Sequence, residues 1–181
     1  MTSFNFIDGP VPAHQHPNGS GWVADTAYVD DTAYVGPDAV VFNNARVLDN
    51  AVVDGNASVF DNAVVSSNAR VVDNAEVFGG AVVAGDAVVA DNSRVSSKAR
   101  VLDNAVVAGN TAVIDYARVS GNAQVFDNAL VAGNAVVAGN AVVAGNARML
   151  DNALIFDNAK VLGYAKVYGN DQVCGYDQVS C

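Results

Sequence analysis

The sequence is poor in the residues that build cross-links and many catalytic sites. It has two cysteines, two histidines and one tryptophan among 181 residues. The cysteines, Cys174 and Cys181, stand at the C-terminal end and are too few for a disulfide framework. No 18-residue apolar run occurs, and the N-terminus lacks the basic and apolar segments of a secretory signal. We therefore expect no membrane span and a cytoplasmic location; a protein carried on a virus particle would also need no signal.

Basic residues are scarce as well. Nine lysines and arginines stand against nineteen aspartates and glutamates, which gives a net charge of −10. Binding to nucleic acid depends on a basic surface that neutralises phosphates, so we expect no nucleic-acid partner. Imitation of DNA by the acidic surface is a weaker alternative, because glycines interrupt the aspartates.

The sequence has instead a six-residue repeat without a single insertion. It runs from residue 23 to residue 178, which is 26 hexads, with valine first in 24 of them and alanine fifth in 22. Asparagine stands fourth in 17 hexads, and the third position is mostly aspartate or glycine. A period of six residues indicates a parallel β-helix, in which stacked repeats bury a core that one repeat cannot bury alone.

The hexad suggests a role for each of its positions. The β-branched valine at position one should point inward, and the small alanine at position five should fit a tight corner. Asparagine at position four should adopt the left-handed backbone of a corner and bond along the stack. Positions two and six should face outward, and aspartate at position three should be a solvated corner residue.

This spacing resembles that of the hexapeptide-repeat proteins, whose left-handed β-helix has a triangular section with three hexads per coil. The resemblance implies an all-β fold, a single-stranded left-handed parallel β-helix of about 8.7 coils, since the 156 residues of the repeat divide by 18. Residues 1–22 would form an N-terminal capping arm and residues 23–181 the β-helix. The GSGWV segment at residues 19–23 resembles the GGWV-type start of bacterial and prophage-encoded hexapeptide arrays of unassigned function.

The ends of such a rod need protection, because an open coil can pair with another chain. The arm has four large apolar residues that should plug the first coil: Phe4, Phe6, Ile7 and Trp22. Its three prolines, Pro10, Pro12 and Pro17, should stop the arm from adding another regular strand.

At the other end, Asp171 and Asp177 replace the corner alanine. Buried carboxylates are costly, so we expect a solvated or frayed last coil that discourages end-to-end stacking. A docking end for a partner chain is the alternative, and truncation from a longer protein is a further one.

Two of the three faces should carry apolar residues at outward positions. Contiguous apolar surface marks association sites, so we expect a homo-oligomer, and the resemblance favours a trimer of parallel rods. The alternative is that β-helix faces simply tolerate valine and alanine. The expected interface residues are Phe42, Phe60, Phe78, Val88, Val106 and Phe126.

The histidines bear on catalysis and on metal binding. Acyltransferases of the resembling family carry a catalytic histidine beside a coil, but here the repeat contains no histidine to act as a general base. The metal site of the family's carbonic anhydrases takes three histidines, whereas this chain has only His14 and His16, in the arm. The aspartates lack the spacing of calcium-binding β-rolls. We therefore expect no enzyme, no metal and no cofactor.

One corner column loses its asparagine in three consecutive coils, at Gly80, Lys98 and Tyr116. Four of the nine basic residues gather there, which suggests a patch that binds a phosphate or carboxylate. The patch comprises Arg94, Ser96, Lys98, Arg100, Tyr116 and Arg118. The alternative is that these cations only solubilise the rod and balance nearby aspartates.

Two functions remain. The first is a non-enzymatic structural or interaction protein, a rigid rod that we expect to be a trimer, to present its faces to protein partners and to be encoded by a phage. The second is a binder of a small anionic, nucleotide-like molecule that uses the basic patch between protomers.

Overall fold

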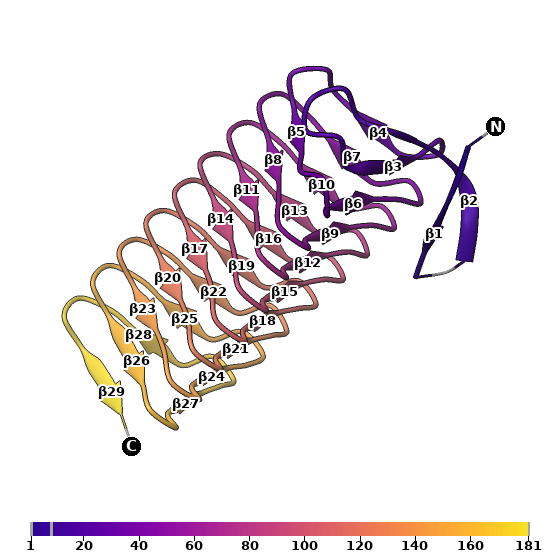
Figure 1. Cartoon of the computed structure of the whole chain (residues 1–181). Coiled ribbons are helices and arrows are strands. Elements are labelled where there is room, and N and C mark those ends of the chain that lie inside the picture. The colour runs from indigo at the N-terminus through magenta and orange to yellow at the C-terminus, as the bar shows by residue number, and fades with distance from the viewer. Residues whose placement is uncertain (1, 8, 181) are drawn as a thin grey trace.

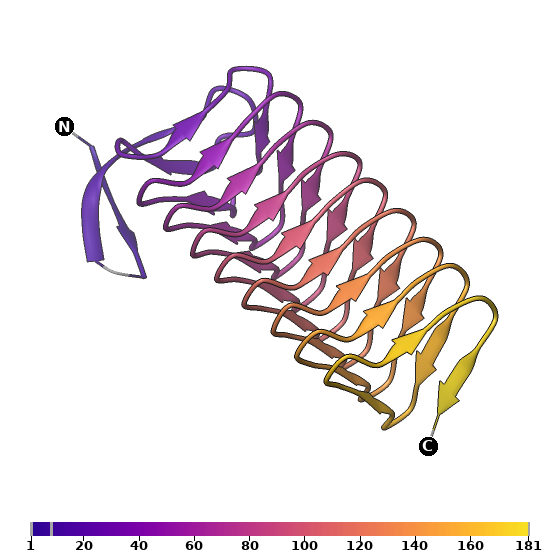
Figure 2. The ribbon, with the colours of Figure 1, turned by 180° about the vertical axis from the view of Figure 1, so that it is seen from behind.

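The computed structural model describes residues 2–7 and 9–180 of the chain, so Cys181 lies outside it. Its elements are 29 strands, and the described part of the chain has no helix that could span a membrane. The strands form three sheets that line the three sides of a long rod, with the two termini at opposite ends (Figure 1). The view from behind shows the same stack of coils without an interrupting loop (Figure 2).

The first sheet contains the arm and one strand from each coil. Its order is β1-β2-β3-β6-β9-β12-β15-β18-β21-β24-β27. The strands are β1 (Ser3–Phe6), β2 (Gly9–Gln15), β3 (Trp22–Ala24), β6 (Val40–Val41), β9 (Ser58–Val59), β12 (Glu76–Val77), β15 (Arg94–Val95), β18 (Ala112–Val113), β21 (Leu130–Val131), β24 (Arg148–Met149) and β27 (Lys166–Val167).

The second sheet has nine parallel strands, with β4 at one edge and β28 at the other. They are β4 (Tyr28–Val29), β7 (Arg46–Val47), β10 (Val64–Val65), β13 (Val82–Val83), β16 (Arg100–Val101), β19 (Arg118–Val119), β22 (Val136–Val137), β25 (Leu154–Ile155) and β28 (Gln172–Val173).

The third sheet also has nine parallel strands, with β5 and β29 at its edges. They are β5 (Tyr34–Val35), β8 (Val52–Val53), β11 (Arg70–Val71), β14 (Val88–Val89), β17 (Val106–Val107), β20 (Gln124–Val125), β23 (Val142–Val143), β26 (Lys160–Leu162) and β29 (Gln178–Ser180).

The register of these sheets confirms the 18-residue coil. Cα partners in neighbouring strands are 18 residues apart, as in Val41 beside Val59 and Val107 beside Val125. With neighbouring strands about 4.8 Å apart, nine coils make a rod roughly 40 Å long. The fold is therefore an all-β solenoid of about nine turns with three parallel sheets.

The inward roles of valine and alanine are confirmed. Position-one side chains from Val35 to Val161 are fully buried, and the position-five alanines between them are buried too. Position-six residues are exposed or half-buried throughout. Most strands of the repeat are only two residues long, so one side chain enters the core and the other faces outward.

The prediction that asparagine at position four adopts the left-handed backbone was wrong. From Asn43 to Gly175 the residue with positive φ is at position three in every hexad, including Asp61 at 59° and Gly79 at 69°. Glycine, aspartate and asparagine tolerate this region best, which explains the composition of position three. Most corners are closed by a turn bond such as that from the Ala45 amide to the Phe42 carbonyl, 3.4 Å long.

The aspartates at position three have a structural task beyond solvation. Oδ2 of Asp61 accepts the Gly79 amide of the next coil at 3.1 Å, and Oδ2 of Asp127 accepts the Gly145 amide at 2.8 Å. A side chain on Gly145 would come within 2.8 Å of the backbone of the following coil. The bond itself does not require glycine as the donor, because the Ser67 and Asp91 amides bind Asp49 and Asp73 in the same way.

Asparagine at position four bonds along the stack, as predicted. The Asn122 amide nitrogen donates to Asn140 Oδ1 at 3.0 Å, and that of Asn140 donates to Asn158 at 3.1 Å. These ladders tie consecutive coils together outside the backbone sheets.

The arm does add strands, so the prediction from its prolines was wrong. Strand β2 contains Pro10 and Pro12 and pairs antiparallel with both β1 and β3. The Ala13 amide bonds to Thr2 at 3.1 Å, so odd-numbered amides face β1. The two prolines therefore lack their N–H on the other side, at and beyond the end of β3, where Pro12 still accepts the Asp25 amide at 2.9 Å.

The apolar residues of the arm do not plug the coil from its end. Phe6 stacks on the outward Phe42 with ring centroids 5.1 Å apart, and Phe4 stacks on Trp22 at 4.7 Å. Ile7 is exposed. The arm thus covers the side of the rod, and residues 16–21 cover the end through bonds such as Gly21 N–H to the Val35 carbonyl at 2.9 Å.

Candidate functional site

The structure divides the predicted basic patch between two faces. Arg94 lies in β15 of the first sheet, whereas Arg100 lies in β16 of the second, beyond the corner. Arg94 is already paired: its Nε lies 2.9 Å from Glu76 Oε2 on the preceding coil. Its charge is therefore largely balanced by the protein itself.

Lys98 and Tyr116 lie at the corner between these faces, as predicted. The Lys98 ammonium stands 5.4 Å from the centre of the Tyr116 ring, within the range of a cation–π contact. Ser96, on the other hand, is buried, with 8% of its surface exposed. At this corner the Lys98 ammonium already contacts the Tyr116 ring, the ring itself is exposed, and Ser96 is buried.

Arg100 and Arg118 are the predicted patch residues that the register brings closest together. They are direct Cα partners in β16 and β19. Arg118 Nε donates to Ser120 Oγ at 3.3 Å, and neither arginine has an ion pair within residues 2–7 and 9–180. Two adjacent guanidinium groups without a carboxylate could together hold an anion.

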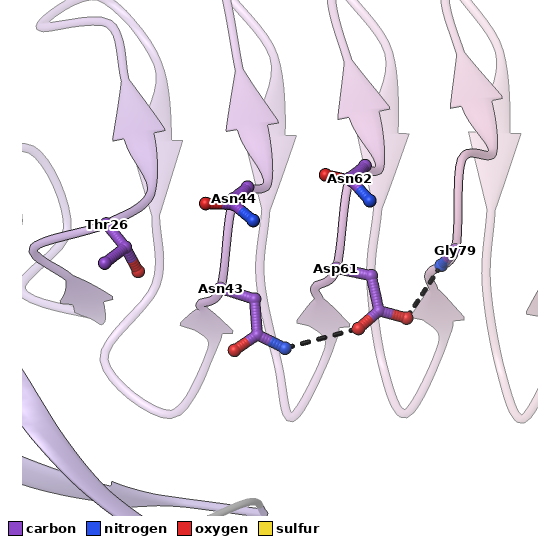
Figure 3. A pocket seen from close by; sticks show the side chains of 6 residues that line it. All are labelled: Thr26, Asn43, Asn44, Asp61, Asn62 and Gly79. Carbon is purple, nitrogen blue, oxygen red and sulfur yellow. Dashed lines mark hydrogen bonds between the residues drawn. The ribbon is translucent and has the colours of Figure 1, made fainter.

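A groove follows the corner between the first and second sheets. One part of it is lined by Thr26, Asn44, Asn62, Gly79 and the pair Asn43 and Asp61 (Figure 3). Asn43 donates to Asp61 Oδ1 at 3.2 Å, and the Gly79 amide binds Oδ2 at 3.1 Å. Both carboxylate oxygens are therefore engaged, which makes this part a structural corner more than a ligand site.

The groove continues over Gly80 to Lys98, Asp115 and Tyr116, where it encloses about 480 Å³. A Cβ atom built on Gly80 would meet Ser97 O at 3.4 Å, an ordinary contact, and Gly80 does not have a positive φ. The fold would therefore accept asparagine at this position. The absence of a side chain at Gly80 opens the groove, although the backbone conformation does not require glycine there.

The predicted interface residues differ in their availability. Phe42 has 1% of its surface exposed because Phe6 covers it, so it is not available to a partner. Phe60 and Phe78 continue the same stack, at centroid distances of 4.9 and 4.8 Å, and are half-buried. The sequence could not show that the arm folds back over the first ring of this column.

The remaining interface residues lie on the third sheet. Val88, Val106 and Phe126 are half-buried on its outward side. The outward positions from Val72 to Ala144 on this sheet hold only one polar residue, and it is uncharged. They are Val72, Val88, Ala90, Val106, Ala108, Gln124, Phe126, Val142 and Ala144.

The two histidines of the arm have local partners. His14 Nδ1 lies 2.9 Å from Asp25 Oδ1, and His16 Nδ1 contacts the Asn18 backbone. His16 is buried, and its Nε2 has no hydrogen-bond partner among the described residues. Within those residues no group of three or more His, Cys, Asp or Glu side chains could hold a metal ion.

In the first coil the pKa values of Asp30 and Tyr28 depart from their ordinary values. The Asp49 backbone amide, 2.7 Å from Asp30 Oδ2, holds the pKa of the Asp30 carboxyl below its usual value. The Tyr28 hydroxyl also donates to Asp30, which raises the pKa of Tyr28. These bonds fix the first corner of the second sheet and are a structural feature.

Sequence reasoning missed a second depression, at the corner between the third and first sheets. It encloses about 500 Å³ and is lined by Asn128, Asn146, Arg148, Tyr164 and Lys166. A signal was present in the sequence, because Arg148 and Lys166 are 18 residues apart and Tyr164 replaces a corner asparagine. The scarcity of basic residues makes such stacking notable.

No protein-family model matches this chain, and no curated protein matches it either.

Proposed function

We propose that this protein is a non-enzymatic structural and interaction protein, a rigid left-handed β-helix of the hexapeptide-repeat type that associates into a homotrimer. The observation that carries the proposal is the uncharged outward face of the third sheet between Val72 and Ala144. The unbroken stack of coils supports a rigid rod, and the resemblance of its sequence to hexapeptide repeats supports three-fold assembly.

The occupant of this face is a second copy of the chain. Each copy has a net charge of −10, so two copies repel each other wherever acidic surfaces meet. The third-sheet face is the surface on which they can approach without that cost, and its apolar side chains would leave water. Two straight rods of the same period can also place every coil in register, which extends the contact along the rod.

The resemblance of residues 19–23 to prophage-encoded arrays suggests where such a rod would act. A phage-encoded spike, adhesin or host-interacting factor needs a stiff spacer with protein-binding faces. The arm that covers the N-terminal coils and the regular coils themselves suit that role.

The test is the oligomeric state of the parent and of two matched variants, measured by sedimentation at micromolar concentration. Val106→Glu places a carboxylate on the third-sheet face and should give a smaller species. Val82→Glu is the control, because it makes the same change at position six of the second sheet, beside Arg100. A monomeric parent, or equal masses for all three proteins, would overturn the proposal.

A second candidate is a binder of a small anionic, nucleotide-like molecule. The neighbouring Arg100 and Arg118 favour it, because no carboxylate balances them in the described part of the chain. A thermal-shift screen of nucleotides and sugar phosphates should stabilise the parent but not the Arg100→Ala/Arg118→Ala variant. Equal shifts in both proteins would exclude this candidate.

A further inference from the structure

We propose that the depression at the corner between the third and first sheets binds a sugar that carries one acidic group. The site is distinct from the third-sheet face and from the pair Arg100 and Arg118. Its walls come from three consecutive coils, with Asn128 in one, Asn146 and Arg148 in the next, and Tyr164 and Lys166 in the third.

Arg148 and Lys166 supply the charge. They are Cα partners in β24 and β27, and both side chains are exposed. Neither has an ion pair or a side-chain hydrogen bond among the described residues, and no carboxylate lines the depression. Two adjacent cations left unbalanced in an acidic protein form a local site for a carboxylate or phosphate group.

Asn128 and Asn146 supply groups that suit hydroxyls. At this corner the amide ladder runs from Asn56 through Asn74 to Asn92. No ladder bond joins Asn128 to Asn146 within the described chain, although their backbone amides are bonded to the next coil. Each side-chain amide therefore keeps both a donor and an acceptor, which is the combination that a sugar hydroxyl can satisfy.

Tyr164 supplies a flat apolar surface with a polar edge. It replaces the corner asparagine of its column, and 70% of its surface is exposed. An exposed aromatic face can pack against the C–H face of a sugar ring while the hydroxyl bonds at the rim. At the other corner, by contrast, Lys98 already lies over Tyr116 and Asp115 lines the groove.

The charge of the whole protein limits the ligand to a small one. A long polyanion would meet the field of a chain with a net charge of −10 beyond the two cations. A single sugar with one acidic group satisfies the ring, the amides and the cations together. The acidic group could be the carboxylate of a uronate or the phosphate of a sugar phosphate, which share this chemistry.

The experiment follows the side-chain amide signals of Asn128 and Asn146 by ¹H–¹⁵N NMR during titration of the full chain. The probes are glucuronate, glucose 6-phosphate, glucose and inorganic phosphate. We expect saturable shifts with one or both acidic sugars, and the tighter one identifies the acidic group. Glucose should bind at least about tenfold more weakly than the acidic sugar, because it lacks the charge-assisted bonds. Absence of saturable shifts with both acidic sugars would overturn the proposal.

The variants use residues that the repeat already tolerates, so that folding is retained. Arg148→Gln and Lys166→Gln should each weaken binding of the acidic sugar about tenfold, whereas Arg70→Gln, an isolated cation on the third sheet, should not. Tyr164→Asn should weaken binding of the sugars but leave that of inorganic phosphate unchanged. An equal effect of Arg70→Gln, or no effect of Tyr164→Asn on the sugars, would refute the site as described.

Discussion

The two ends of the rod bury the position-one valines of the three sheets to different extents. At the N-terminal end Val23 in the first sheet has 1% of its surface exposed and Val35 in the third has 0%, whereas Val29 in the second is half-buried. At the C-terminal end the exposure rises from 3% at Val167 to 6% at Val173 and 36% at Val179. Both ends keep the inward valine of the repeat, so the difference in valine burial depends on what lies beside each coil.

The N-terminal end is covered by residues that do not follow the hexad. Residues 16–21 bond to the first coil, and the hairpin of β1 and β2 packs Phe6 on Phe42. At the C-terminal end Asp171 and Asp177 are exposed, and strands β27, β28 and β29 have no further partner among the described residues. A coil of this repeat is therefore buried only when something lies on each side of it, and a covering segment must come from another sequence pattern.

The largest expected effect comes from placing the same charge at the two ends. Val23→Asp buries a carboxylate without a partner and should destabilise the protein by about 3 kcal/mol or more. Val179→Asp leaves its carboxylate in water and should cost less than about 1 kcal/mol. Urea unfolding followed by circular dichroism measures both. Equal losses would show that the covering segment does not exclude water from the first coil.

The contact between the hairpin and the rod can be tested with two neighbouring residues. Phe6 has 6% of its surface exposed, whereas Ile7 has 74%. Phe6→Ala should therefore cost about 3 kcal/mol and open the hairpin, with loss of hydrogen-exchange protection in β2. Ile7→Ala is the control and should change protection little. If Phe6→Ala leaves the protection of β2 intact, the stack on Phe42 does not hold the hairpin.

The asparagine ladder allows a finer comparison near the open end. Asn152 accepts a bond from Asn134 and donates one to Asn170, whereas Asn170 only accepts. At about 0.5–1 kcal/mol for each bond, Asn152→Ala should lose roughly twice the stability of Asn170→Ala. Chemical unfolding of the two variants against the parent measures this ratio. Equal losses would indicate that the amides prefer water to the ladder.

The smallest effect concerns pH at the covered end. The Asp49 amide and then the Tyr28 hydroxyl lower the pKa of Asp30 below its ordinary value, 3.8. The ionised carboxylate therefore stabilises the folded state above that value, and the contribution is lost as the pH falls through the folded-state pKa. Asp30→Asn should melt below the parent at neutral pH.

The difference between Asp30→Asn and the parent should shrink when the pH falls below 3.8. Tyr28→Phe removes one of the two donors, so it should show a smaller difference with the same direction. Melting temperatures measured from neutral to acidic pH test this. A difference that stays constant with pH would assign the effect to the loss of shape alone.

The fold could be predicted from the sequence because one period states which residues stack. The inward valines, the small corner alanines and the asparagine bonds along the rod all follow from an 18-residue coil. The left-handed residue was not placed at position three, since asparagine, aspartate and glycine all tolerate the left-handed conformation. The signal was the glycine: it recurs at position three and stands at position four only in Gly80.

The arm and the sites were harder to predict because they depend on contacts outside the period. The register places Arg94 beside Glu76, but it does not show that their side chains form an ion pair. The burial of Phe42 depends on where the hairpin folds, which no repeat records. The depression around Tyr164 depends on the Asn128 and Asn146 side chains, which form no ladder bond with each other, and the spacing of residues does not reveal this.

Because the repeat has no insertions, adding or removing residues in it shifts every later residue by a fixed distance and rotation along the rod. Duplication of 18 residues would lengthen the rod by one strand spacing, about 4.8 Å, and leave every downstream column in place. Duplication of six residues would keep the core equally well filled, because the hexads share the same inward residues. It would, however, advance every downstream side chain by one face. Gain or loss of a hexad is therefore nearly silent for the core but exchanges the surfaces of everything beyond it, so that new combinations of faces arise without new core packing.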